Sequence, residues 1–328
     1  MEQNVPFQAV IEALLDDDLP FPARFLHRFS DLPPVELDAV KKTSPKVSSH
    51  RKHTLLEDLE DLAETETLTS FDDMARSLLA DPDPDVRTRA IRLLWESEDV
   101  KLIPVYLKML NEDEDTGTRA AAANALGQFV YLGELEKYPS KTKKQVEDQL
   151  LAATTTAKES LVRRRALESL GYSGRKEVIP LIETAYHQKD PDWLVSALFA
   201  MGRSCDERWK KQVLTQVHAS NEDVRSEAIH ATGELELSSA RPALLDLLAD
   251  EEDLKIRREI VWALSKIGGE GVRARLEELL EMEEDDDEAD FIEEALDALN
   301  FTEEMGPFNL LDVDPDVDFI EEEPDNEE

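Results

Sequence analysis

Acidic residues near the end of the chain stand at alternate positions, the spacing at which carboxylates ligate calcium in a calcium-binding loop. These acids are Asp312, Asp314, Asp316, Asp318 and Glu323. Val317 stands where such a loop requires glycine, and Pro315 interrupts the run. We therefore expect an acidic, disordered tail here. No metal ion or other cofactor is expected elsewhere in the chain.

Cys205 is the single cysteine, so it cannot form an internal disulfide. It follows Gly202 closely, at a turn between two helices of a repeated unit. This position favours a small packing residue over a nucleophile. The six histidines are scattered along the chain and form no catalytic constellation with the cysteine.

Charged residues recur in phase with an apolar register. Position zero of this register is occupied by Val86, Thr118, Val162, Trp193, Val224, Ile256 and Phe291. An acid or amide stands three residues before every zero, alanine stands four after zero in six of the seven, and arginine directly follows zero in five. Successive zeros are 32, 44, 31, 31, 32 and 35 residues apart. A period of this length is typical of stacked supersecondary units.

The constant phase between these charges and the apolar register predicts a structural role for them. Charge-assisted hydrogen bonds between neighbouring units would hold their spacing constant. The predicted structural ladder consists of Asp83, Arg87, Asp115, Arg119, Arg163, Asn221, Arg225, Asp253 and Arg257. We therefore expect these residues to stabilise the stacking rather than to form a binding site.

Paired helices are the elements that must position these residues, since leucine and alanine are frequent and only 6% of residues are aromatic. Residues 1–70 are expected to form irregular helices that cap the stack, residues 71–300 the repeats, and residues 301–328 the acidic tail. The 44-residue spacing predicts a surface loop near residues 133–144. N-caps of the second helices are expected at Asp85, Asp192, Asp223 and Asp290.

The phrase from Asp83 to Ala90, and that from Val162 to Gly171, resembles HEAT repeats, particularly the short bacterial kind named after phycobilisome-lyase proteins. The resemblance covers about residues 71 to 300. It implies an all-α fold, an α-solenoid of about seven helix pairs, in a bacterial protein. In that family the arginine after position zero commonly pairs with an acid of a neighbouring turn, and here Leu194 and Ile292 replace it.

Enzymes built on such repeats are poorly matched by this chain. A resemblance to deoxyhypusine hydroxylase would imply paired His-Glu steps that hold two irons, and no histidine here is followed by glutamate. A DNA glycosylase built on HEAT-like repeats would need a basic groove that binds phosphates, and a net charge of −38 argues against such a groove and against a nucleic-acid partner. We therefore predict that the protein is not an enzyme. A relationship to bilin lyases is kept as an alternative.

The surface positions of the second helices offer a better candidate. If positions zero, four, five and eight face the core, positions two, six and ten point outward, onto the concave face of a HEAT solenoid. Aromatic and basic side chains collect there in the third to sixth units, in what we call the inner-face lane: Arg164, Tyr172, Phe199, Arg203, His230, Arg258, Trp262 and Lys266. Aromatic residues and arginine dominate protein interfaces, so the lane predicts a protein or peptide partner.

The final segment resembles what an aromatic and basic lane would bind. The last 52 residues hold 25 acids and no Lys, Arg or His. Apolar residues lie among these acids, namely Phe308, Leu310, Leu311, Val313, Phe319 and Ile320. We hypothesise that this acidic-hydrophobic segment occupies the lane until a partner displaces it. Capture of a basic partner by the acidic segment is a further alternative.

The expected setting is the cytoplasm. No stretch approaches the roughly 18 apolar residues of a membrane span, and Met1 to Leu15 lacks the basic-then-apolar pattern of a signal peptide. The sequence thus predicts a cytoplasmic, non-catalytic scaffold or adaptor that binds protein and does not contact membranes.

Overall fold

The computed structural model describes residues 6–66 and 68–305, with side chains to Phe301. Its described part is α-helical and contains no strand, as predicted. The first segment holds two short 3-10 helices, η1 (Ala23–Phe29) and η2 (Ser44–Lys46), and the helices α1 (Phe7–Leu15), α2 (Pro34–Thr43) and α3 (Ser49–Thr65). Seven helix pairs follow, so the predicted α-solenoid is confirmed.

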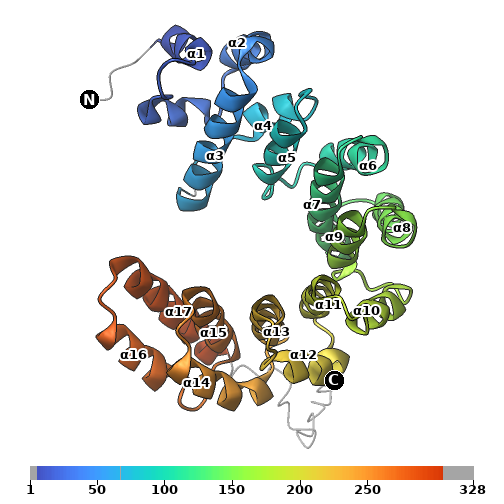
Figure 1. Cartoon of the computed structure of the whole chain (residues 1–328), viewed down its shortest axis with the longest axis vertical. Helices are drawn as coiled ribbons and strands as arrows, with labels where there is room; N and C mark the ends of the chain where they lie inside the picture. Colours follow the sequence, from blue (N-terminus) through green and yellow to red (C-terminus); the bar gives the residue numbers. More distant parts are fainter. Residues whose placement is uncertain (1–5, 67, 306–328) are drawn as a thin grey trace, which may run out of the picture.

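The helix pairs form two layers along a C-shaped path, and the second helix of each pair lies on the inner side (Figure 1). The outer helices are α4 (Asp72–Leu78), α6 (Leu102–Glu112), α8 (Ser140–Thr156), α10 (Val178–Tyr186), α12 (Lys210–Gln216), α14 (Arg241–Asp250) and α16 (Val272–Met282). The inner helices are α5 (Pro84–Arg92), α7 (Thr116–Glu134), α9 (Ser160–Leu170), α11 (Pro191–Arg203), α13 (Glu222–Glu234), α15 (Leu254–Ile267) and α17 (Asp286–Met305). Short 3-10 helices η3 (Glu207–Trp209) and η4 (Ser238–Ala240) precede α12 and α14.

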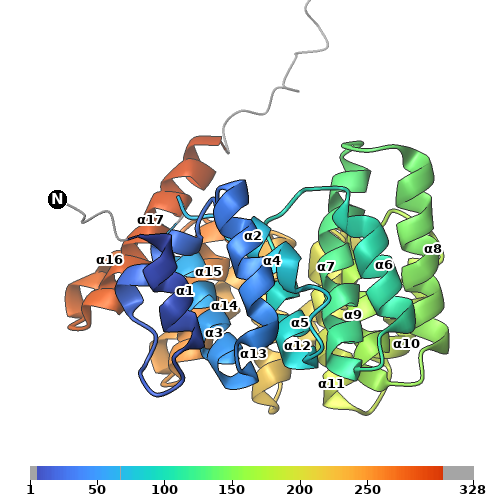
Figure 2. The same cartoon turned by 90° about the horizontal axis from the view of Figure 1, so that it is seen from above.

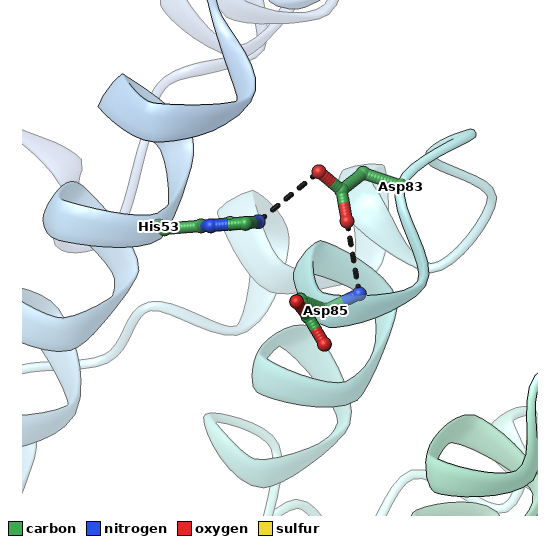
Figure 3. Close-up of side chains that lie close together, drawn as sticks. All are labelled: His53, Asp83 and Asp85. Atoms are coloured by element: carbon green, nitrogen blue, oxygen red, sulfur yellow. Dashed lines mark hydrogen bonds and ion pairs between the residues drawn. The ribbon is translucent and has the colours of Figure 1, made fainter.

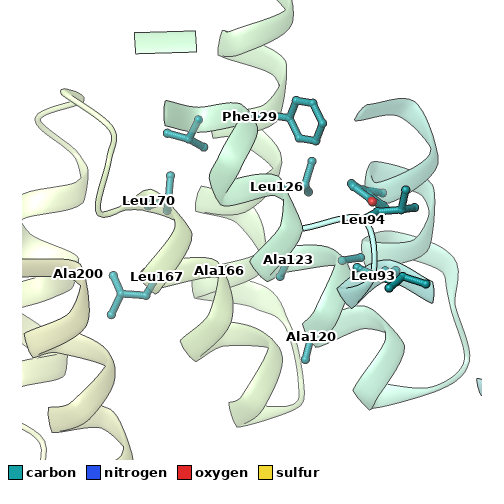
Figure 4. Packing of buried hydrophobic residues seen from close by; sticks show 14 of the residues in the cluster. Leu93, Leu94, Ala120, Ala123, Leu126, Phe129, Ala166, Leu167, Leu170 and Ala200 are labelled. Carbon is teal, nitrogen blue, oxygen red and sulfur yellow. The ribbon is translucent and has the colours of Figure 1, made fainter. Parts of the chain in front are cut away.

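The apolar register places its residues in the core between the two layers. In the first pair Val86, Ala90, Ile91 and Leu94 are all buried, which confirms positions zero, four, five and eight as the inward face. Figure 4 shows buried residues of the following pairs. They include these positions in α7 and α9 and also other positions, such as Ala120, Phe129 and Ala200. The core is therefore a continuous layer along the solenoid, and each pair is stabilised by its neighbours.

Small residues bring neighbouring inner helices into close contact. The glycine nine after zero packs against the residue seven after zero in the next unit, so a Cβ on Gly171 would lie 2.9 Å from the Cα of Ala200. The same pairing joins Gly127 to Ser169, Gly202 to Ala231 and Gly233 to Ala263. This repeated contact shows that consecutive inner helices are parallel and nearly in register.

The helix N-caps lie two residues earlier than the sequence predicted. In α5, α11 and α13 the capping side chains belong to Asp83, Asp190 and Asn221, where Asp85, Asp192 and Asp223 were expected. The same position, three before zero, caps α7 through Asp115 and α15 through Asp253. In these five helices the recurring acid or amide thus satisfies free backbone N–H groups of the first helical turn, whereas Glu159 before α9 makes no side-chain cap and pairs with Arg119 instead.

The register of the seventh unit also differs from the prediction. Asp285 accepts hydrogen bonds from the backbone N–H groups of Asp287 and Glu288, so Asp285 caps α17, where Asp290 was expected. Position zero is therefore the buried Glu288, not Phe291, and Ile292 four residues later is buried as well. The last spacing then becomes 32 residues, in line with the other short spacings.

The insertion near residues 133–144 is largely helical rather than a surface loop. Helix α7 continues to Glu134 and α8 begins at Ser140, so both helices project beyond their neighbours at one edge (Figure 2). The hydroxyl of Tyr138 donates a hydrogen bond to the carbonyl oxygen of Phe129 and packs over Gly133. The inserted residues thus extend an existing helix pair.

Candidate functional site

The inner helices α9, α11, α13 and α15 line the concave side of the solenoid (Figure 1), and the eight lane residues lie on or directly after them. Arg258 and Lys266 are exposed, whereas the other six side chains are half-buried. Five of these six pack on one another, and Arg164 pairs with Asp192. Positions six and ten of one helix are four residues apart, so their side chains lie one above the other. The lane is consequently a packed surface layer rather than a row of separate side chains.

Arg203 lies between two aromatic rings. Its guanidinium carbon is 4.1 Å from the ring centroid of Phe199 and 4.7 Å from that of Tyr172. The ring of Tyr172 in turn contacts that of Tyr131 on α7, with 5.3 Å between centroids. Cation–π attraction of this kind holds the guanidinium in place and leaves its edge available to hydrogen-bond acceptors.

The hydrogen-bonding capacity of Arg203 is largely unused. Its Nη1 donates to the carbonyl oxygen of Glu168 at 3.4 Å, and no carboxylate in the described chain forms an ion pair with it. Burial lowers the pKa of its guanidinium from the ordinary value. An arginine carries five N–H donors, so most of them lack a protein acceptor here.

On the next two inner helices, His230 of α13 and Trp262 of α15 form a second stack. Their rings are nearly parallel, with an interplanar angle of 6° and 4.3 Å between centroids. The ring of Trp262 covers Gly233, where a Cβ would lie 2.5 Å from it, and the ammonium of Lys266 is 5.8 Å from the ring centroid. The glycine column thus provides the space in which this tryptophan lies flat on the inner face.

Acidic residues interleave with the lane, although the lane defined from the sequence contains only aromatic and basic residues. His230 Nδ1 is 3.0 Å from a carboxylate oxygen of Glu259 and Nε2 is 3.6 Å from one of Glu234. Arg164 pairs with Asp192 at 2.8 Å, and Arg258 pairs with Glu288. The expectation of a basic inner surface is therefore wrong, because neighbouring carboxylates balance most of its cations.

Two titratable groups in this surface have strongly shifted pKa values. Burial raises the pKa of Glu227 to about 7, an effect that Glu259 and Glu168 reinforce and that His230 and Arg203 oppose. Burial disfavours protonation of His230, but hydrogen bonds to Glu234 and Glu259 outweigh it and raise the pKa of the imidazole to about 10. At neutral pH His230 is thus a cation, and Glu227 is divided between its two protonation states.

A groove of about 590 Å³ opens beside the second stack. Its walls are formed by His230, Leu254, Lys255, Arg258, Glu259, Trp262 and Phe291. The surface of Leu254 is 47% exposed, and the guanidinium carbon of Arg258 lies 5.4 Å from the ring centroid of Phe291. The groove therefore combines apolar walls with a charged rim, as sites for hydrophobic side chains of a polypeptide do.

Four arginines of the predicted ladder contact an acid near the start of the next inner helix, and in three of them this acid stands five residues before the next zero. Arg119 pairs at 2.8 Å with Glu159, the acid three before the next zero. Arg87 instead forms a bidentate pair with Asp113, and Arg225 and Arg257 approach Glu251 and Glu283. Arg163 has no ion pair in the described chain and lies over the ring of Trp193 at 5.5 Å.

One group of side chains in the described residues has a composition that could ligate a metal ion. His53, Asp83 and Asp85 each place a ligand atom within 4.8 Å of the others (Figure 3). Asp83 already accepts hydrogen bonds from the backbone N–H of Asp85 at 3.0 Å, and its other oxygen lies 3.1 Å from His53 Nε2. This arrangement is explained by the N-cap of α5, and Asp85 itself is exposed.

Comparison with protein families agrees with this architecture. A family model for HEAT repeats matches residues 73–140 and 211–297. The chain is a HEAT-repeat protein. A narrower relationship to the phycobilisome-lyase type stays a prediction. None of the curated proteins matches the sequence.

Several solved structures are similar to this HEAT-repeat chain. The Escherichia coli protein YibA is 19% identical over 74% of this chain and 95% of its own length, with a TM-score of 0.34. Human deoxyhypusine hydroxylase is 20% identical, over 80% of this chain and 95% of its own length, with a TM-score of 0.35. Kap121p, in its complex with Nup53p, is 14% identical over 92% of this chain but only 39% of its own length, with a TM-score of 0.45.

No helix among the described residues combines the length and the apolar character needed to span a membrane.

Proposed function

We propose that this HEAT-repeat protein is a non-catalytic scaffold that binds a polypeptide segment along the inner-face lane. The observation that carries the proposal is the placement of two aromatic stacks and an apolar groove on one concave surface. Rigid aromatic rings that are already packed lose little conformational entropy on binding, which makes them effective interface residues.

The spacing of the lane suits an extended segment. Parallel inner helices in contact lie about 8–10 Å apart, whereas an extended or polyproline-type chain advances about 3.1–3.3 Å per residue. A segment that crosses the inner helices at right angles would therefore place roughly every third side chain at the next helix. Arg203 on α11 and Trp262 on α15 are two helices apart, so they would contact positions about six residues apart.

The paired charges of the lane favour binding through apolar and aromatic contacts. Most cations are already paired with carboxylates, so general attraction between opposite charges would contribute little to affinity. Burial of apolar and aromatic area would provide most of the binding free energy, with charged groups at the rim providing selectivity.

Affinity capture with the full chain tests the proposal. We expect partners captured by the wild-type protein to be lost with the double variant Phe199→Ala, Trp262→Ala, because each ring is central to one stack. Trp95→Ala is a matched control, since Trp95 is an aromatic residue that is 59% exposed but lies outside the lane. The proposal is wrong if the double variant, with unchanged helical content by circular dichroism, retains the same partners as the control.

A further inference from the structure

Most donors of Arg203 lack an acceptor although the guanidinium is held between two rings. Removing a guanidinium from water without full compensation by anions is unfavourable. Glu168, Glu227 and Glu234 lie close enough to act on its charge, but none of them forms an ion pair with it, and Tyr172 and Phe199 supply only ring faces. The bidentate geometry of arginine matches a carboxylate. The arrangement therefore has the chemistry of a carboxylate-binding subsite.

We propose that Arg203 binds a carboxylate of the chain's own acidic segment, residues 308–320, whose apolar residues enter the groove beside Trp262. This inference rests on the proposed function of the lane. It names the occupant of the lane in the free protein. The segment lies outside the described residues, which end at Met305, so the argument depends on where that end lies and on the order of residues after it.

The parallel arrangement of the inner helices places the start of the segment at the correct edge. Arg203 is the last residue of α11, Lys266 lies in the last turn of α15, and Met305 ends α17. Because these helices run in the same direction, all three residues lie toward the same edge of the concave face. The segment thus starts on the side of the lane where Arg203 and Lys266 lie.

The segment is long enough to reach both the groove beside Trp262 and the guanidinium of Arg203. Three steps of about 8–10 Å separate α17 from α11, through α15 and α13, or roughly 24–30 Å in all. Residues 306–318 span up to about 43 Å when extended. The groove is formed by the first turns of α15 and α17, with Trp262 at its near end, so Leu310 and Leu311 rather than Phe308 are far enough from Met305 to reach it. The aspartates after them would reach Arg203. The order along the chain, apolar and then acidic, matches the order of the subsites in space.

Covalent attachment favours this segment over a separate acidic partner. The chain carries a net charge of −38, so a free acidic peptide is repelled at long range. Tethering offsets this repulsion without removing it, because a short linker gives the segment an effective concentration on the order of millimolar.

Cys205 offers a direct test, because it is exposed, is the only thiol and lies two residues from Arg203. A benzophenone photocross-linker attached to Cys205 of the full chain would be activated, and the cross-linked peptides mapped by mass spectrometry. We expect cross-links to residues 306–328 in the wild-type protein. Their yield should fall at least fivefold with Arg203→Gln, and equally with Asp312, Asp314, Asp316 and Asp318 all changed to Asn.

Two controls make the result decisive. Lys211→Gln removes one exposed positive charge on α12 and should leave the yield unchanged. Mixing ¹⁵N-labelled with unlabelled protein distinguishes cross-links within one chain from those between two copies. The inference is overturned if the cross-links are absent, persist in both the Arg203 and tail variants, or join different copies. Partner capture that still depends on Phe199 and Trp262 would then leave the proposed function intact.

Discussion

Individual side chains on the inner face depend on each other for their charge states. Glu227 lies among Glu168, Arg203, His230 and Glu259, and its Oε1 is buried with no hydrogen-bond partner. An acid in such surroundings is more stable protonated, which is why its pKa is raised to about 7. The same surroundings keep His230 protonated well above neutral pH.

The shifted pKa of Glu227 predicts a pH dependence of stability. The native protein binds the proton more tightly than the unfolded chain, whose glutamate has the ordinary pKa of 4.5. The free energy of unfolding should therefore decrease as pH rises from about 4.5 to 7. Glu227→Gln should remove this pH dependence. The free energy of unfolding of the variant, relative to that of wild type, should therefore rise by roughly 3 kcal/mol between pH 4.5 and 7. Urea denaturation of both proteins at several pH values measures the difference, and parallel curves would contradict it.

Gly171 provides a prediction about close packing. Alanine normally stabilises a helix relative to glycine, but a Cβ here would lie 2.9 Å from both the Cα and the carbonyl oxygen of Ala200. Gly171→Ala should thus lower the free energy of unfolding by about 2 kcal/mol, as overpacking does. Gly174→Ala is the matched control, because a Cβ there meets nothing closer than 3.8 Å. Equal stabilities of the two variants would show that the helices can separate without cost.

The residues of the lane and their contacts four residues apart, such as Phe199 with Arg203, could be predicted from helical phase, but contacts between repeats could not. Periodicity places Phe199, Arg203 and Trp262 on one face because it depends only on position along the helix. The partners of these residues come from other repeats at separations near 30 residues, as with His230 and Glu259. Helical phase also places Glu168 at position six, but it does not predict that this acid is buried and accepts a hydrogen bond from Ser196 of the next repeat.

At the scale of the helix, the recurring acid or amide acts mainly as an N-cap. Asn221 accepts a hydrogen bond from the backbone N–H of Val224 at 3.0 Å, whereas Asp223 is mostly exposed and has only a distant contact with Lys255. The sequence alone favoured the acid nearest to the first apolar residue. Cap geometry favours the residue three positions before it, because the side chain must reach the N–H groups of the first turn.

Asn221 and Asp223 allow the N-cap assignment to be tested with two matched substitutions. Asn221→Ala should lower the free energy of unfolding by about 1 kcal/mol, the usual cost of a lost N-cap. Asp223→Ala should change it by less than about 0.5 kcal/mol, as exposed substitutions do. Chemical denaturation of both variants measures the difference, and a larger loss for Asp223→Ala would contradict the assignment.

For the whole molecule, the repeat period was sufficient to predict the α-solenoid and its seven helix pairs. Such a prediction succeeds because each unit contacts only its neighbours, so the fold is encoded locally and repeatedly. The seventh unit has a register that the repeat period alone does not determine. Its acids at Asp285 and Glu288 both fit the capping pattern, and only the burial of Glu288 and Ile292 decides the register.

The central claim is that a polypeptide binds along the concave face of α11 to α15, and hydrogen–deuterium exchange of the full chain tests it most directly. Exchange would be compared between the protein alone and its complex with a partner obtained by affinity capture. We predict slower exchange in the complex around residues 199–203 and 258–266, with little change in the outer helices α10, α12 and α14. Protection confined to the outer helices, with unchanged exchange along the inner face, would contradict the claim.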